Sequence, residues 1–82
     1  MRKFKYLVID HDGTPVAILF PETESHHRVS ALLGYQVLGA GFALVDVEGD
    51  HVHYEAMGSS ASLKISSRPE DTLIINQQFG GR

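Results

Sequence analysis

The chain has 82 residues, of which 43% are apolar and 21% are charged, and its formal net charge is −3. That length gives room for one domain, residues 1–82, and the composition is typical of a folded chain and not of a disordered one. There is no cysteine, which excludes disulfides and thiolate metal sites and favours a reducing, cytoplasmic setting.

Charge and hydropathy argue against two classes of partner. The negative net charge gives no bulk electrostatic support for contacts to a phosphate backbone, so we expect no nucleic-acid partner. The longest apolar runs, 15–20 and 39–45, are far shorter than the roughly 20 residues that a membrane span needs. No long apolar stretch with a cleavage site follows the basic N-terminus, so we expect neither a signal peptide nor a membrane anchor.

The N-terminal part of the chain predicts a β-hairpin. Residues 4–10 alternate in a pattern rich in β-branched and aromatic side chains, and residues 16–20 form a second apolar run. Asp12 and Gly13 lie between the two runs, and a glycine-containing turn in this position is typical of a hairpin. Pro15 should begin the second strand, where its missing N–H is tolerated.

A short helix is predicted next. Ser25 is suited to cap its start, because a serine hydroxyl can accept a hydrogen bond from a free N–H of the first turn. Val29, Leu32 and Leu33 recur at helical spacing, and Gly34 suits the left-handed position after the helix end. A helix of two to three turns is unstable alone, so its apolar stripe should pack on the sheet.

Strand patterns return after this helix. Residues 35–47 are mostly apolar, and the two glycines within them predict either a bulged, bent strand or a tight turn between two strands. Residues 48–50, Glu-Gly-Asp, predict a second hairpin turn, and residues 51–57 alternate cleanly between the two faces of a strand. Residues 63–65 indicate one more short strand.

The C-terminal segment carries two conflicting signals. Ser67 and Glu70 form the pattern of a capping box, and Pro69 suits the first turn of a helix. The β-branched residues Thr72 and Ile74 favour a strand instead. We expect a helix over residues 70–79, with a strand as the alternative.

These elements together predict an α+β domain. Its sheet should be antiparallel or mixed, with five to six short strands, one short helix after the second strand and a second helix at the C-terminus. The expected core comprises the apolar residues on one face of each element: Phe4, Tyr6, Val8, Val16, Ile18, Phe20, Val29, Leu32, Leu33, Val45, Val47, Val52, Tyr54, Leu63, Ile65, Leu73 and Ile75.

Residues 6–14, Tyr-Leu-Val-Ile-Asp-His-Asp-Gly-Thr, resemble the first motif of haloacid-dehalogenase-type phosphatases. The resemblance implies a nucleophile at Asp10 and a general acid and base at Asp12. That chemistry also needs a Mg²⁺ site and a parallel sheet with crossover helices, whereas a return strand follows this motif. We therefore expect both aspartates to serve a hairpin turn, and we predict no catalytic residues, no enzymatic activity and no cofactor.

Histidines are the densest chemical feature of the chain, which has five. His51 and His53 are two residues apart on a predicted strand, so they share a face, and Glu55 extends that row. Imidazole and carboxylate ligands suit Zn²⁺ or a similar ion, and Asp46 could supply a further ligand from the neighbouring strand. The alternative is that this row is the solvated face of an antiparallel sheet.

The C-terminal sequence Phe79-Gly80-Gly81-Arg82 is similar to the tail of ubiquitin-like β-grasp proteins. That resemblance implies a carrier whose terminal Gly-Gly is activated, with residues 70–73 in the last strand of the family. For this chain it would also require removal of Arg82. A helix end followed by glycine is the simpler interpretation.

Residues 63–71, which follow a Gly-Ser-Ser turn, resemble the C-terminal end of small uncharacterised proteins encoded in bacterial genomes and prophages. The resemblance implies no activity, only accessory proteins that act by binding others.

Since the sequence gives no support for catalysis, nucleic-acid binding or a membrane anchor, a binding function remains as the hypothesis. The pattern favours a non-catalytic protein–protein interaction or regulatory module, whose partner is another protein or a second copy of the chain in a homodimer. A homodimer is attractive because residues 37–47 carry a single charge, at Asp46, and would pair readily if they lay at a sheet edge. The alternatives are a metal- or small-ligand-binding domain that uses His51 and His53, and a ubiquitin-like carrier.

Overall fold

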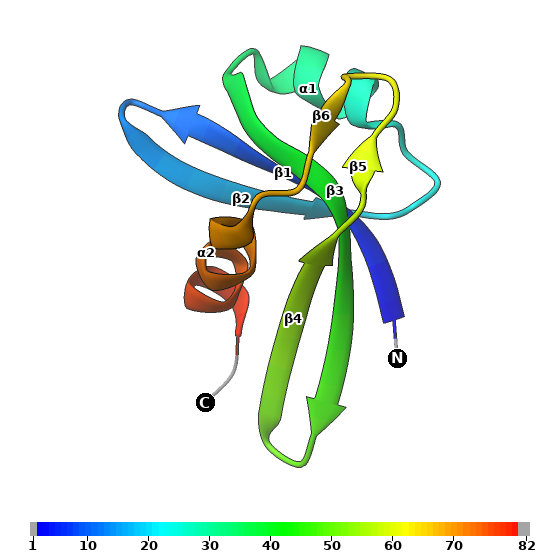
Figure 1. Cartoon of the computed structure of the whole chain (residues 1–82), viewed down its shortest axis with the longest axis vertical. Helices are drawn as coiled ribbons and strands as arrows, with labels where there is room; N and C mark the ends of the chain where they lie inside the picture. Colours follow the sequence, from blue (N-terminus) through cyan, green and yellow to red (C-terminus); the bar gives the residue numbers. More distant parts are fainter. Residues whose placement is uncertain (1, 81–82) are drawn as a thin grey trace.

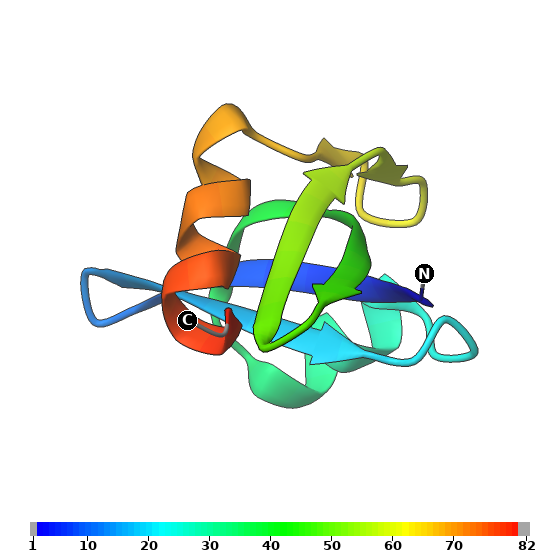
Figure 2. The same ribbon diagram turned by 90° about the horizontal axis from the view of Figure 1, so that it is seen from below.

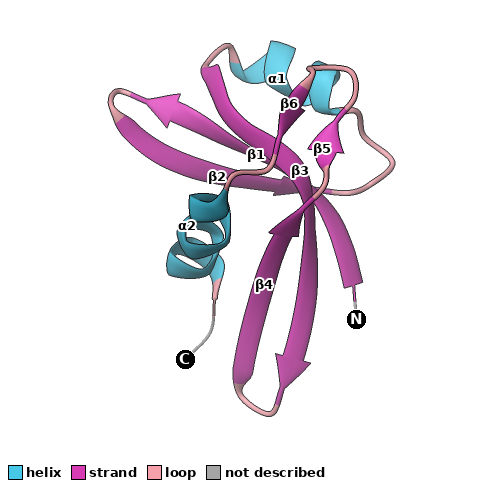
Figure 3. Ribbon diagram, in the orientation of Figure 1, coloured by secondary structure: helices cyan, strands magenta, loops and turns pink. Residues whose placement is uncertain are grey.

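Four antiparallel strands form a curled sheet in the computed structural model, which describes residues 2–80 (Figure 1). The elements in chain order are β1 (Arg2–His11), β2 (Thr14–Phe20), α1 (His26–Leu33), β3 (Gln36–Glu48), β4 (His51–Met57), β5 (Ser59–Ser60), β6 (Ile65–Ser66) and α2 (Pro69–Phe79). The sheet has the order β2-β1-β3-β4, while β5 and β6 pair only with each other. Figure 3 shows this small ribbon outside the sheet, and it contacts β3.

This architecture confirms the α+β class, the helix after the second strand and the C-terminal helix. The prediction of five to six strands fits the six strands within residues 2–80, but four of them form the sheet and the other two form a separate ribbon. β1 has 10 residues and β3 has 13, and these two strands form the centre of a sheet of only four strands. The remaining two strands form a ribbon outside it, because each pairs over only two residues.

The glycines of β3 bend the strand without interrupting it. Opposite Val8 and Ile9 the register shifts by one residue, so Val8 faces Gly39 and Ile9 faces Val37. This is the bulged strand of the two alternatives that the glycines predicted. β3 pairs with β1 over residues 36–45 and with β4 over residues 42–48, so it is an inner strand of the sheet and residues 42–45 are paired on both sides. Residues 37–41 have β1 as their partner strand, and the β5–β6 ribbon also contacts β3.

The hairpin between β1 and β2 forms as its sequence predicts. Asp12 and Gly13 both have positive φ, 53° and 88°, which is the geometry of the two-residue turn that Asp-Gly favours. Asp10 Oδ1 accepts a hydrogen bond of 2.8 Å from the Gly13 N–H and closes the turn. The Asp10 carboxylate therefore has a structural role in this hairpin.

Both ends of α1 are also formed by the residues predicted for them. Ser25 Oγ accepts a 3.0 Å hydrogen bond from the Arg28 N–H, and Gly34 follows the helix with φ at 75°. A left-handed backbone is strained for a residue with a branched Cβ.

We expect Gly34→Val to lower the free energy of unfolding by more than about 1 kcal/mol, and Gly34→Asn to lower it less, because asparagine tolerates this conformation better. A Cβ at this position meets no heavy atom within 4 Å, so the effect should come from the backbone alone. Urea denaturation of the wild type and the two variants measures these free energies. If Gly34→Val were as stable as the wild type, backbone strain at this position would be contradicted.

The start of α2 differs from the prediction by one residue. Arg68, and not Ser67, occupies the N-cap position, and Asp71 takes the place of Glu70 at the third helical position. The arginine side chain has no acceptor, so the Asp71 N–H donates instead to the Arg68 carbonyl at 3.0 Å. The Arg68 N–H donates to Asp71 Oδ2 at 2.9 Å. The shift puts Asp71 on the buried face of the helix, where it is 0% exposed.

Apolar residues pack on both faces of the sheet. One layer lies under α2 and is built around Tyr6, Val8, Ala17, Ala43 and Ile75. The other lies under α1 and the β5–β6 ribbon and is built around Leu7, Ile9, Phe20 and Ala40. The predicted core missed the second face of β1 because it assigned only one face of that strand to the interior.

Three predicted core residues are instead largely exposed: Leu32 by 79%, Val47 by 63% and Leu73 by 60%. α1 has only eight residues and contacts the sheet through Val29 and Leu33, which leaves Leu32 outside. Val47 lies near the tip of the β3–β4 hairpin. Leu73 lies on the side of α2 opposite the buried Ile75.

His26 is a buried histidine in the first turn of α1. It is 4% exposed and lies between the rings of Phe20 and Phe42, and its Nε2 is 2.8 Å from the carbonyl oxygen of Gly41. Burial lowers the pKa of His26, and nearby Lys5 acts in the same direction, although the hydrogen bond to Gly41 opposes them. The neutral ring therefore donates from Nε2 to the carbonyl.

We expect the protein to lose stability as the pH falls below about 6.5, the ordinary pKa of histidine. Over that range the unfolded chain takes up a proton at His26 while the folded chain resists it, so unfolding is favoured at lower pH. His26→Gln keeps a neutral donor, and its stability should change less between pH 7.5 and pH 5. Urea denaturation at both pH values measures the difference, and the same acid dependence in the variant would contradict this role.

Within residues 2–80, no helix is long and apolar enough to cross a membrane.

Candidate functional site

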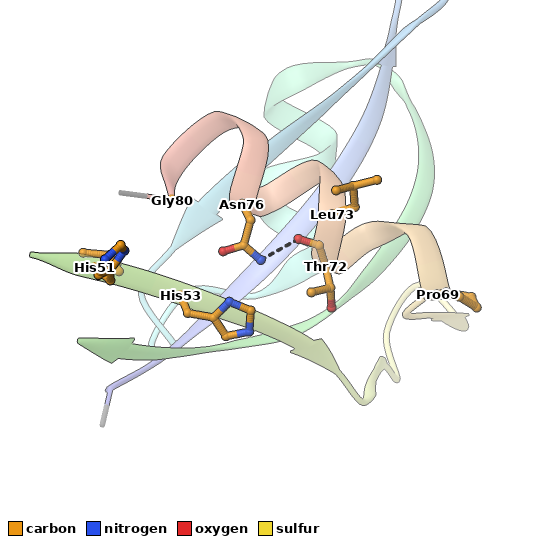
Figure 4. Close-up of a pocket in the computed structure, with 8 residues that line it drawn as sticks. His51, His53, Pro69, Thr72, Leu73, Asn76 and Gly80 are labelled. Atoms are coloured by element: carbon orange, nitrogen blue, oxygen red, sulfur yellow. Dashed lines mark hydrogen bonds between the residues drawn. The ribbon is translucent and has the colours of Figure 1, made fainter. Parts of the chain in front are cut away.

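A groove of about 530 Å³ lies between α2 and the outer edge of β4 (Figure 4). Its lining is mostly apolar, with polar atoms contributed by a few side chains. The strand contributes His51, Val52 and His53, and the helix contributes Pro69, Thr72, Leu73, Asn76 and Gly80. Pockets of this size, apolar with a small number of placed polar groups, are typical binding sites.

The floor of the groove is a set of hydrogen bonds from α2 to the backbone of β4. Asn76 Oδ1 accepts from the Tyr54 N–H at 2.8 Å, and Asn76 Nδ2 donates to the Tyr54 carbonyl at 2.7 Å. One turn earlier, Thr72 Oγ1 accepts from the Ala56 N–H at 3.0 Å. These side chains take the place of a neighbouring strand.

Gln78 makes the same kind of contact at the opposite edge of the sheet. Its Oε1 accepts from the Ala17 N–H at 2.6 Å, and its Nε2 donates to the Ala17 carbonyl at 3.1 Å. Because β2 and β4 are the two edge strands, α2 bridges both open edges of the curled sheet, and it lies between them in both views (Figures 1 and 2). Such covering protects a small sheet from pairing with other chains.

A buried polar network holds α2 in this position. Asp71 Oδ2 accepts from the Tyr6 hydroxyl at 2.6 Å, and Asp71 Oδ1 accepts from Arg68 Nε at 2.9 Å. Arg68 Nη2 is also 2.8 Å from that oxygen but lies off the hydrogen-bond axis. Burial and the adjacent carboxylate raise the pKa of Tyr6, which keeps its hydroxyl protonated as the donor. A Cβ at Gly39 would collide with the same carboxylate, so this position requires glycine.

One part of the β4 edge remains open in the groove. Since the Tyr54 and Ala56 backbones face α2, Val52 presents its N–H and C=O on the same edge by the two-residue alternation of a strand. No side chain in residues 2–80 forms a hydrogen bond to either group. Leu73 lies on the helix side of the groove, 60% exposed.

The hairpin beside the groove is strongly acidic. It carries four exposed carboxylates, and no lysine or arginine occurs anywhere between residues 29 and 63. Within residues 2–80 none of the four forms an ion pair. We call these residues the hairpin carboxylates: Asp46, Glu48, Asp50 and Glu55. Their formal charge of −4 exceeds the net charge of the whole chain, −3.

The predicted histidine row is present on β4. His51 lies opposite Glu48 and His53 lies opposite Asp46 in the β3–β4 register, and Glu55 follows on the same face. His51 and His53 also line the groove. Within residues 2–80, however, no three histidine, aspartate or glutamate side chains come together in an arrangement that could hold a metal ion. Metal binding by this row stays a prediction.

Residues of the two resemblances lie elsewhere. Asp10 and Asp12 are in the β1–β2 hairpin, and an antiparallel return strand follows them, as predicted. Residues 70–73, which the ubiquitin-like resemblance assigned to a last strand, are in α2. Gly81 and Arg82 lie outside the described residues.

Comparison of the chain with protein-family models, with curated proteins and with solved structures finds no match. The resemblance of residues 63–71 to small bacterial and prophage proteins therefore stays a prediction.

Sequence reasoning missed the groove and the residues that build it. Thr72 and Asn76 are four residues apart and Gln78 follows, so these polar side chains flank the buried Asp71 and Ile75 on α2. That arrangement was a usable signal, because polar residues that border the apolar face of a helix can reach the edges of a sheet beneath it.

Proposed function

We propose that this domain is a non-catalytic protein-interaction module and that its partner binds in the groove between α2 and β4. The observation that carries the proposal is the groove itself, which combines an exposed leucine, Leu73, with an unoccupied strand edge at Val52. Short peptide segments are commonly bound by such a combination, because main-chain hydrogen bonds add to side-chain burial.

The polar groups of the groove also favour binding over chemistry. Thr72 and Asn76 are engaged with the β4 backbone. The carboxylates opposite His51 and His53 in the β3–β4 register, Glu48 and Asp46, are exposed and do not line the groove. Nucleophilic and acid–base sites need such paired groups within hydrogen-bond reach.

A second copy of the chain is a less favoured partner. A homodimer that pairs through residues 37–47 needs this stretch at a sheet edge, whereas β3 lies between β1 and β4 in the strand order. The actual edges are shielded by Asn76 and Gln78. A heterologous segment that fits the groove requires no rearrangement of these contacts.

Selection of random peptides on the folded protein tests the proposal. We expect enriched peptides to bind the wild type, to lose binding to Leu73→Gln and to retain it with Leu32→Gln. Leu32 is a matched control because it is also an exposed helical leucine, on α1. The proposal fails if no peptide is enriched or if the two variants weaken binding equally.

A further inference from the structure

The charge and shape of the groove indicate which kind of protein segment binds there. Resting on the proposed function, we infer that its partner is an extended, basic peptide segment, which places an apolar side chain against Leu73 and one or more lysine or arginine side chains beside the hairpin carboxylates. The backbone of this segment pairs with the free N–H and C=O of Val52.

Charge complementarity supports a basic occupant. The four hairpin carboxylates are exposed and lie on the same hairpin as the strand side of the groove. With no lysine or arginine between residues 29 and 63, the hairpin has no internal cation to neutralise them. On the neighbouring strand β1, Arg2 and Lys3 lie opposite Val45 and Leu44, but neither forms an ion pair with the four carboxylates within residues 2–80. A surface with an excess of negative charge attracts a positively charged partner and speeds its association. The same surface repels nucleic acid and anionic lipid.

The available strand edge supports an extended segment. Asn76 occupies both backbone groups of Tyr54 and Thr72 accepts from the Ala56 N–H, whereas no side chain in residues 2–80 bonds to either backbone group of Val52. A peptide can form two main-chain hydrogen bonds there, and its next side chains then alternate between the groove and solvent. Since a single position is paired, the interface is small and the binding weak and transient.

Helix α2 supplies the apolar contact for this segment. Leu73 is exposed beside Pro69, and Val52 faces them from the strand. An apolar peptide side chain in this space buries Leu73, which otherwise remains in water at a cost proportional to its apolar area. The anchor and the charges therefore lie on adjacent parts of one surface.

Three synthetic peptides test the inference by fluorescence polarisation against the full chain. They share a central leucine in an extended context and differ only in flanking residues, which are lysine, glutamine or glutamate. We expect the lysine peptide to bind most tightly and to weaken as salt is raised from 50 to 500 mM, because screening reduces exposed charge interactions. Glu48→Gln combined with Asp50→Asn should weaken it about fivefold.

The matched control is Glu22→Gln combined with Glu24→Gln, which removes two carboxylates from the loop before α1 and should leave binding unchanged. If the glutamine peptide binds as tightly as the lysine peptide and both lose affinity with Leu73→Gln, the basic preference is wrong and the proposed function stands. If no peptide binds, both fail. A dimer in sedimentation equilibrium that Leu73→Gln disrupts would assign the groove to a second copy and overturn the inference.

Discussion

Replacing Asp71 by alanine is expected to lower the free energy of unfolding by about 3–5 kcal/mol, the usual cost of removing one partner from a buried charged pair. The carboxylate is 0% exposed and accepts hydrogen bonds from the Tyr6 hydroxyl, the Arg68 N–H and Arg68 Nε. Alanine leaves these donors without an acceptor. A chain of this length has a total stability of about 4–12 kcal/mol, so the variant should be close to unfolding.

Urea denaturation with circular dichroism measures this effect. Glu70→Ala is the control, because Glu70 is the adjacent residue and its carboxylate is 3.5 Å from Arg68 Nη1 but 56% exposed. An exposed pair of this kind contributes less than about 1 kcal/mol. If Asp71→Ala does not fold, Tyr6→Phe provides a milder test and should cost about 2 kcal/mol, because the one hydrogen bond that it removes goes to a carboxylate. Equal stabilities of the Asp71 and Glu70 variants would contradict the role of the network.

Features set by neighbouring residues were predictable from the sequence. The turn at Asp12 and Gly13, the cap at Ser25 and the left-handed Gly34 each depend on contacts within about four residues. Their residue types have few structural alternatives, and the structure confirms all three.

Features that join distant segments were not predictable. Tyr6 and Asp71 are 65 positions apart, and Ala17 and Gln78 are 61 apart, so no local pattern connects them. The strand order is also a long-range property, because a hairpin defines its two strands but not their other neighbours. For this reason the sequence could not show that residues 37–47 belong to β3, which lies between β1 and β4 in the strand order.

The candidate site combines both kinds of feature. Strand alternation predicted that His51 and His53 share a face, and they do. The groove beside them exists only because α2 is placed against β4, and the residues that place it, Asp71 and Asn76, look like ordinary polar residues in a helix. The β-branched residues near them even favoured a strand, which tertiary packing overrides.

Replacing Asn76 by alanine is expected to open the edge of β4. The side chain makes two hydrogen bonds to the Tyr54 backbone and one of 2.8 Å to the Thr72 carbonyl. Loss of these hydrogen bonds should lower the free energy of unfolding by about 2 kcal/mol. Each hydrogen bond contributes about 1 kcal/mol, and the higher helix propensity of alanine offsets part of the loss. The larger consequence is that Tyr54 joins Val52 as an unpaired stretch of strand edge.

An unpaired edge of this length is a template for pairing with another chain. We therefore expect Asn76→Ala to self-associate at protein concentrations at which the wild type does not change its association state. Sedimentation equilibrium over a hundredfold range of protein concentration measures this. Gln77→Ala is the control, because Gln77 is the next residue on α2 and is exposed. If Asn76→Ala lost stability but kept the association state of the wild type, Asn76 would stabilise the fold without preventing other chains from pairing with β4. Self-association confined to the Asn76 variant would establish that its amide blocks the strand edge.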